Sequence, residues 1–426
     1  MPGSMRRSRV GQSRVTATAS RRHRPDHQLI LFMGLLVLIG LVVLFAISPY
    51  QIHRINADGG SLDQGHYMLK QIIYLLLGAG TFFVGSIVPL QMWRRFAGPL
   101  VMSALVVCAM LALLGLLSIP PAMCFNGACR WFNFGIVSFQ PAEFLKFALL
   151  IFGAAFLGRR IQQGTINHAN DTMVPIAILV AVAMFFVIGL QKDMGTGLTM
   201  LGIMLAMVIV SGVSTRLLAV SGAAIAGLGV LFVILSPHRM ERIVTFLGAG
   251  GGSDSNSYHI DMAKLAIGSG GLFGRGLGNG VQAFGYLPEA LNDSIFAVLG
   301  EIFGFVGLVI IIGLFAALLM RIMRVSERLS DPMMRLLCAG VFGWLGTHVV
   351  VNIGAMTGVM PLTGVTLPFL SFGGTSLLFM MAALGVVYHV SRFTSYQILT
   401  QGSSHEATSS RRGVGGSRYT RTRRYQ

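Results

Sequence analysis

Charged side chains are scarce in this sequence. Only 11% of its 426 residues are Asp, Glu, Lys or Arg, whereas 54% are hydrophobic and the mean hydropathy is +0.72. A soluble globular domain of this size needs more charge on its surface than this. The composition therefore excludes a soluble protein and indicates an integral membrane protein.

Cysteine is also sparse, with four residues in the whole chain. Cys108 and Cys338 lie in apolar stretches, where a thiol normally packs as a small apolar side chain. Cys124 and Cys129 lie in a polar loop that the topology below places outside, where either a tight disulfide or two free thiols would fit. Further Cys or His ligands are lacking nearby, which argues against zinc.

The alternation of apolar and polar residues that marks membrane-spanning strands is absent. A helix needs roughly 20 apolar residues to cross about 30 Å of hydrocarbon. We therefore expect an all-α polytopic membrane protein with about ten transmembrane helices. The expected helices cover residues 28–48, 69–90, 96–118, 142–157, 173–190, 195–213, 217–236, 294–320, 334–353 and 370–390.

The distribution of charge predicts the orientation of these helices. An even number of spans puts both termini on one side, and that side holds 23 of the 32 Lys and Arg residues but 5 of the 15 acidic ones. By the positive-inside rule, both termini are cytoplasmic. A large extracytoplasmic loop, about residues 237–293, then lies between helices seven and eight.

Two basic tails, residues 1–27 and 396–426, contribute +6 and +5 of the formal net charge of +17. They contain few apolar residues and should be disordered. Orientation and attraction to anionic membrane lipids explain their charge without nucleic acid. Docking of a cytoplasmic partner is the alternative.

Three ionisable residues fall at or inside expected spans. Glu143 and Lys146 share one helix face at the start of the fourth span, and Asp193 follows the fifth. Each would cost on the order of 3 kcal/mol if unpaired at mid-membrane. They must pair or face water, which predicts a polar core open to the outside; a structural pair near the interface is the plainer alternative for Glu143 and Lys146.

The long loop contains the most promising chemistry. It holds Arg239 and Arg242, a glycine-rich run at 268–280, and the stretch 286–296 with Glu289 and Asp293. The glycines, among them Gly276 and Gly278, either let the backbone run close to a neighbouring helix or offer N–H groups to a lipid pyrophosphate. Asp293 is a candidate general base, although a helix N-cap would also favour Asp.

The stretch 360–376 combines two prolines, three glycines and several hydroxyls, including Ser371, in an apolar region. This pattern predicts either re-entrant backbone, buried by protein or solvated by a wet cavity, or a hinged outer turn.

Several of these motifs, in this order, resemble the SEDS family of peptidoglycan glycosyltransferases, the RodA/FtsW/SpoVE group. The resemblance covers about residues 28–395 and is strongest to its division branch, FtsW. The matching motifs are Arg130-Trp131, Gln140-Pro-x-Glu143-x-x-Lys146, Gln191-x-Asp193-x-Gly195-Thr196, Gly270-Gly271-x-x-Gly274-x-Gly276-Leu-Gly278, Tyr286-Leu-Pro-Glu289-Ala and Leu-Pro-x-x-Ser371-x-Gly-Gly374.

The resemblance implies polymerisation of lipid II at the outer face of the cytoplasmic (inner) membrane, with loss of undecaprenyl pyrophosphate. It maps the catalytic Asp of the family onto Asp293. A leaving pyrophosphate needs positive charge, for which Arg130, Lys146, Arg239, Arg242 or a divalent ion are candidates. The other candidate supporting residues are Glu143, Asp193, Glu289, Glu301 and Ser371. The resemblance also implies a class B penicillin-binding transpeptidase (FtsI-like) and other divisome proteins as partners, a place at the division septum, and a divalent cation, Mg²⁺ or Mn²⁺.

The chain departs from the family pattern beside the candidate base. The family usually reads Pro-Glu-x-His-Thr-Asp-Phe, whereas this chain has Leu291, Asn292 and Ser294 around Asp293, and His259 follows Tyr258 where Gln is usual. One alternative function is a lipid II flippase or transporter, although no internal repeat supports a repeat-built transporter. A non-catalytic divisome scaffold is the other.

Overall fold

The computed structural model of the chain describes residues 20–22, 24–57, 59–125, 128–135, 137–220, 222–223, 227 and 255–395. The α-helices are α1 (His27–Ala57), α2 (His66–Ile87), α3 (Leu90–Leu116), α4 (Pro141–Gln162), α5 (Val174–Met184), α6 (Met194–Val210), α9 (Ser255–Ser269), α10 (Ile295–Glu327), α11 (Pro332–Met356) and α12 (Gly374–Val390). Wider π-helical turns form η1 (Ala169–Met173), η2 (Phe185–Leu190) and η3 (Gln282–Tyr286). The strands are β1 (Ser20–Arg22), β2 (Ala122–Phe125), β3 (Ala128–Asn133), β4 (Ser138–Phe139) and β5 (Phe393–Ser395).

The all-α polytopic architecture is confirmed. In the described part, seven helical segments are long and apolar enough to cross a membrane, counting Ala169–Leu190 as one, and α6 and α12 are shorter apolar helices. Each corresponds to an expected span. The remaining expected span, 217–236, falls largely outside the described residues, as do both basic tails.

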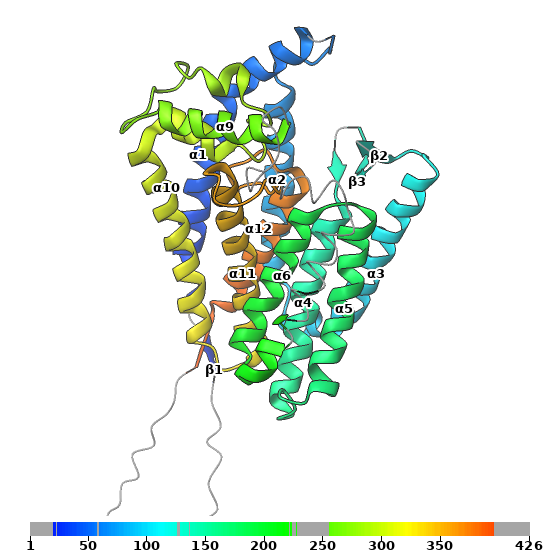
Figure 1. Cartoon of the computed structure of the whole chain (residues 1–426). Coiled ribbons are helices and arrows are strands. Elements are labelled where there is room, and N and C mark those ends of the chain that lie inside the picture. Colours follow the sequence, from blue (N-terminus) through cyan, green and yellow to red (C-terminus); the bar gives the residue numbers. More distant parts are fainter. Residues whose placement is uncertain are drawn as a thin grey trace, which may run out of the picture. The chain divides into compact units, whose positions relative to one another are not determined.

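The helices divide into a central and a peripheral group. In the most apolar windows of α4 and α11, 83% and 72% of residues are buried, against 22% in α2 and α3. α11 packs on both α4 and α6, and α12 packs on α2 (Figure 1). Polar side chains on α4 and α11 can therefore be shielded from lipid by protein on every side.

A small antiparallel sheet, β2-β3-β4, follows α3 and leads into α4 (Figure 1). Cys124 lies opposite Cys129 in the β2–β3 register, and the two are joined by a disulfide. Of the two states that the sequence allows for this pair, the structure has the bonded one. Cys108 and Cys338 are free and buried, as expected of apolar packers.

α10 is not the continuous helix that the sequence predicts. Gly304 interrupts it with φ 66°, and the glycine-rich run packs into the break. The N–H groups of Arg275 and Gly276 donate to the carbonyls of Glu301 and Ile302, while those of Phe305 and Val306 donate to the carbonyls of Gly271 and Leu272. The loop thus supplies the hydrogen bonds that the broken helix lacks, as backbone away from water requires.

α9 runs across the direction of α10 rather than along it (Figure 1). A helix at 258–267 with Ile260, Ala263, Leu265 and Ile267 turned to lipid is the expectation from sequence. Leu265 is exposed, but Ala263 is fully buried and Ile260 and Ile267 are half-buried, because α9 packs on α10 and α11. The expected lipid face is therefore wrong for Ala263.

Candidate active site

A cavity of about 480 Å³ gathers polar side chains from segments far apart in the chain. It lies where the central helices α4, α6 and α11 meet the turn before α10 and the non-helical stretch before α12. It is lined by Lys70, Tyr74, Met123, Arg130, Trp131, Ser138, Gln140, Glu143, Asp193, Gly195, Thr196, Thr199, Glu289, Asn292, Asp293, His348, Gly364, Val365, Thr366, Phe372, Gly373, Gly374, Thr375 and Ser376. Five of the sequence-predicted site residues are among them: Arg130, Glu143, Asp193, Glu289 and Asp293.

Asp293 lies on a tight turn that borders the cavity. Glu289 occupies the left-handed region with φ 49°, and its carbonyl accepts the N–H groups of Asn292 and Ser294 at 3.0 and 3.2 Å. Asn292 Nδ2 also donates to Glu289 Oε2 at 2.5 Å. The N-cap of α10 is Ser294 rather than Asp293, so the helix-cap interpretation of Asp293 is wrong.

Two attachments hold this turn to the protein core. Asn352 of α11 donates from Nδ2 to the carbonyls of Asp293 and Val365, both at 2.7 Å, and the Phe372 N–H donates to the carbonyl of Leu291 at 2.8 Å. Asn352 is almost fully buried. Asn352 was not among the residues predicted from the sequence, although a single amide in an apolar helix is itself a signal of a polar site.

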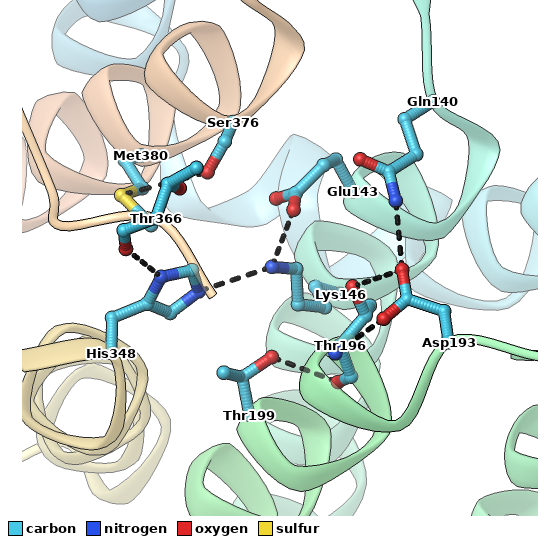
Figure 2. Close-up of polar contacts among 10 residues, drawn as sticks. All are labelled: Gln140, Glu143, Lys146, Asp193, Thr196, Thr199, His348, Thr366, Ser376 and Met380. Carbon is cyan, nitrogen blue, oxygen red and sulfur yellow. Dashed lines mark hydrogen bonds and ion pairs between the residues drawn. The ribbon is translucent and has the colours of Figure 1, made fainter. Parts of the chain in front are cut away.

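Beside the cavity, a buried ion pair continues into a chain of polar contacts. Lys146 Nζ lies 2.6 Å from Glu143 Oε1 and 3.2 Å from His348 Nε2, and His348 Nδ1 lies 3.0 Å from the carbonyl of Thr366 (Figure 2). Lys146 also lies over the ring of Trp344, 5.2 Å from its centroid. Each charge of this buried pair has a partner of opposite sign, as charged groups away from water require. His348, missed from the sequence, joins α11 to this chain of contacts.

Asp193 caps α6 rather than standing free in the cavity. Its carboxylate accepts from the Thr196 N–H at 3.0 Å, from the Thr196 hydroxyl at 2.8 Å and from Gln140 Nε2 at 3.0 Å (Figure 2). Arg130 closes the same region from β3, donating to the carbonyls of Gln191 and Lys192 at 3.2 and 2.8 Å. Both residues shape the cavity wall.

Lys70 of α2, not predicted from the sequence, is a second cation of the cavity wall. It is half-buried, and among the described residues no ion pair involves it. In the described part of the chain, the wall contains two cations, Lys70 and Arg130, and four carboxylates.

Other predicted site residues lie away from the cavity wall. The Glu301 carboxylate is fully buried and accepts the N–H groups of Val281, Gln282 and Ala283 at 2.6, 3.0 and 2.7 Å, which anchors the loop that contains Gly276 and Gly278. Ser371 accepts the Leu367 N–H at 2.9 Å within the stretch before α12. Glu301 and Ser371 therefore accept hydrogen bonds from backbone N–H groups and are not part of the cavity wall. Arg239 and Arg242 lie outside the described residues.

Within the described ranges, no group of three or more His, Cys, Asp or Glu side chains could hold a metal ion.

Comparison with known proteins shows the family to which this chain belongs. The family model FTSW_RODA_SPOVE, described as "Cell cycle protein", matches residues 26–396. This chain belongs to that family. Within the FtsW/RodA/SpoVE family, stage V sporulation protein E of Bacillus subtilis (strain 168) is 34% identical over 379 residues, covering 88% of this chain and 100% of that protein. The probable peptidoglycan glycosyltransferase FtsW of Coxiella burnetii is 35% identical over 330 residues, covering 76% of this chain and 86% of that one.

Two solved structures of similar proteins extend the comparison. A chain from a peptidoglycan synthase complex, studied for the structural coordination of polymerization and crosslinking, superposes with a TM-score of 0.70 at 29% identity, covering 86% of this chain and 98% of that chain. The rod shape determining protein RodA of Thermus thermophilus superposes with a TM-score of 0.62 at 28% identity, covering 86% and 97%. The family resemblance inferred from the motifs is confirmed.

Proposed function

We propose that this chain is a peptidoglycan glycosyltransferase that polymerises lipid II into β-1,4-linked glycan strands. The observation that carries the proposal is the place of Asp293, on a turn fixed by Asn352, in a cavity that also contains Lys70 and Arg130. Family membership and relatives named peptidoglycan glycosyltransferases support the same activity.

Asp293 is proposed as the general base. As the sugar hydroxyl of the acceptor attacks the anomeric carbon of the donor, its proton passes to the Asp293 carboxylate. The new bond joins the acceptor oxygen to that carbon, and the bond to the pyrophosphate oxygen breaks. The configuration at the anomeric carbon is inverted, and undecaprenyl pyrophosphate leaves.

The leaving pyrophosphate needs positive charge. Lys70 has no ion pair among the described residues, so its ammonium group is the cation of the wall best able to bind phosphate oxygens. Arg130 is engaged with backbone carbonyls and would act mainly by its charge. Arg239 and Arg242 stay candidates from the sequence alone.

A divalent cation, Mg²⁺ or Mn²⁺, is proposed to arrive with the substrate rather than to reside in the protein. Mg²⁺ commonly binds through one or two carboxylates together with substrate phosphates. When bound, it would neutralise charge on the pyrophosphate.

The proposed setting is the cytoplasmic membrane with both termini cytoplasmic, the cavity reached from outside and the enzyme at the division septum. Relatives named FtsW support a division role, and the similar chain from a peptidoglycan synthase complex supports a class B penicillin-binding transpeptidase as partner.

The test is lipid II polymerisation by the purified full-length chain with its transpeptidase partner. Asp293→Asn should lower the rate at least about 100-fold, the lower bound for loss of a general base. Asp171→Asn, at an exposed carboxylate of η1, is the matched control and should retain the wild-type rate. Full activity of Asp293→Asn would exclude Asp293 as the base.

The alternative functions give different results in the same preparation. A lipid II flippase would move lipid II across vesicle membranes, and that movement would survive Asp293→Asn. A non-catalytic scaffold would show no polymerisation even in the wild type.

A further inference from the structure

Two neighbouring side chains of α9 hold opposite ends of the segment that carries Asp293. The Tyr258 hydroxyl donates to the carbonyl of Tyr286 at 3.2 Å, and His259 Nε2 lies 2.6 Å from Oγ of Ser294. Neither α9 residue is among those that line the cavity. Residues 286–294 are therefore attached at both ends to a helix that stands outside the cavity wall.

The Ser294 hydroxyl has one proton, and this fixes the direction of its hydrogen bond with His259. The Ser294 hydroxyl donates its only proton to the carbonyl of Pro288 at 2.7 Å, since a carbonyl can only accept. Toward His259 the hydroxyl must then accept, so His259 Nε2 carries the hydrogen. Burial lowers the pKa of His259, opposed by the Glu289 carboxylate, so a neutral imidazole with its hydrogen on Nε2 makes this bond at neutral pH.

Ser294 is used in an unusual way for its position. A serine at a helix N-cap normally accepts a backbone N–H of the first turn, but the Ser294 side chain makes no such bond at the start of α10. Its fully buried hydroxyl instead connects His259 to Pro288. In place of a capping hydrogen bond to α10, the Ser294 hydroxyl links α9 to the turn that carries Asp293.

The turn is fixed from the core side by Asn352 and Phe372, through the carbonyls of Asp293 and Leu291. Both contacts come from the core side of the turn. The bond from His259 to Ser294, the residue next to Asp293, attaches the turn to α9 as well.

We propose that His259 is a positioning residue, which holds Asp293 in the cavity through Ser294 so that the place of α9 controls the activity of the site. The inference rests on the proposed glycosyltransferase function. It assigns His259 a role for which neither contact with substrate nor proton transfer is needed.

The test compares three variants of the full-length chain with its transpeptidase partner. His259→Leu keeps an apolar bulk without a donor, Ser294→Ala removes the hydroxyl, and His259→Gln keeps an N–H donor. His259→Leu and Ser294→Ala should each lower kcat about tenfold with little change in KM, the size of one lost hydrogen bond. His259→Gln should stay within about twofold of the wild type, and the double variant His259→Leu/Ser294→Ala should be no slower than Ser294→Ala alone.

The control is Asp261→Asn, at an exposed position of the same helix, which should leave kcat unchanged. Wild-type kcat in His259→Leu overturns the proposal. So does a double variant in which the two losses multiply, or His259→Gln as slow as His259→Leu at equal thermal stability.

Amide hydrogen exchange without substrate separates this inference from the proposed function. The Asn292 and Ser294 N–H groups should exchange about tenfold faster in His259→Leu than in the wild type or His259→Gln. Unchanged exchange overturns the attachment, whether or not the wild type polymerises lipid II. Faster exchange in a chain that does not polymerise refutes the proposed function alone.

Discussion

The buried charges of this protein are paired with specific neighbours. Removal of one partner therefore changes the free energy of unfolding by leaving the other charge unpaired. Glu143 and Lys146 pair at 2.6 Å with almost no exposure to solvent. A buried carboxylate left without its ammonium partner is strongly destabilising, whereas a neutral pair of similar size is tolerated far better.

Lys146→Met should therefore destabilise the protein by about 3 kcal/mol or more. Glu143→Gln in the same chain should recover most of the loss, because it removes the uncompensated charge. Thermal unfolding in detergent measures both effects, with Lys192→Met at an exposed position as the control. A double variant as unstable as Lys146→Met would show that the pair does not act as a unit.

Protonation of His259 gives a pH dependence whose direction follows from its pKa. Burial lowers that pKa below its ordinary value of 6.5, so below pH 6.5 the unfolded chain binds more protons at this site than the folded chain. The contribution of His259 to stability is complete above pH 6.5 and is lost as the pH falls toward the folded-state pKa. His259→Gln should flatten the fall in melting temperature below pH 6.5, and an unchanged slope would contradict this assignment.

At the scale of elements, the helix spans were predictable and the breaks in them were not. Apolar runs of sufficient length predict α1 to α6 and α10 to α12 because the bilayer requires helical hydrogen bonding. The interruption at Gly304 could not be assigned from sequence alone, because Gly300, Gly307 and Gly313 in the same helix leave it unbroken. The break is favourable because the backbone of residues 271–276 bonds to it. These residues lie about 30 positions earlier in the chain, so a local sequence pattern does not reveal the contact.

The candidate site divides in the same way. Glu143, Lys146 and Asp193 could be identified because charges in apolar spans are costly and therefore meaningful. Lys70, His348 and Asn352 were missed because none of them forms a recognisable motif with its neighbours in sequence, and each reaches the site only through contacts with distant segments. Glu301 shows the opposite error, since an intramembrane carboxylate near Asp293 serves backbone N–H groups instead of the cavity.

Substitution of Gly304 tests the broken helix. Alanine there would need a positive φ, and its Cβ would lie 2.3 Å from the Gly274 nitrogen. Gly304→Ala should cost at least about 1 to 2 kcal/mol from the backbone conformation alone. Gly313→Ala, with nothing within 4 Å of the new Cβ, should be neutral or stabilising in a thermal unfolding assay. Equal melting temperatures for the two variants would argue against the inserted loop.

At the scale of the whole molecule, the orientation in the membrane is open to a chemical test. The proposed topology puts the β2–β3 hairpin outside, where the disulfide between Cys124 and Cys129 is compatible with an oxidising environment. The two remaining cysteines are buried.

A membrane-impermeant maleimide added to intact cells should therefore label the chain only after treatment with an impermeant reductant. The variant Cys124→Ser/Cys129→Ser should stay unlabelled under both conditions. Labelling that requires permeabilised cells would place the hairpin on the cytoplasmic side and reverse the proposed topology.

The cavity wall draws on residues from Lys70 to Ser376, and no single stretch of the chain supplies more than part of it. During synthesis the N-terminal helices enter the membrane first, as domains fold in the order in which they are made. Asp293 reaches the bilayer before Asn352 and Phe372, the residues that fix its turn from the core, have been translated. A nascent or truncated chain that ends before α11 would therefore contain every predicted acidic residue of the site and still lack Asn352 and Phe372, so the turn that carries Asp293 would not yet be fixed.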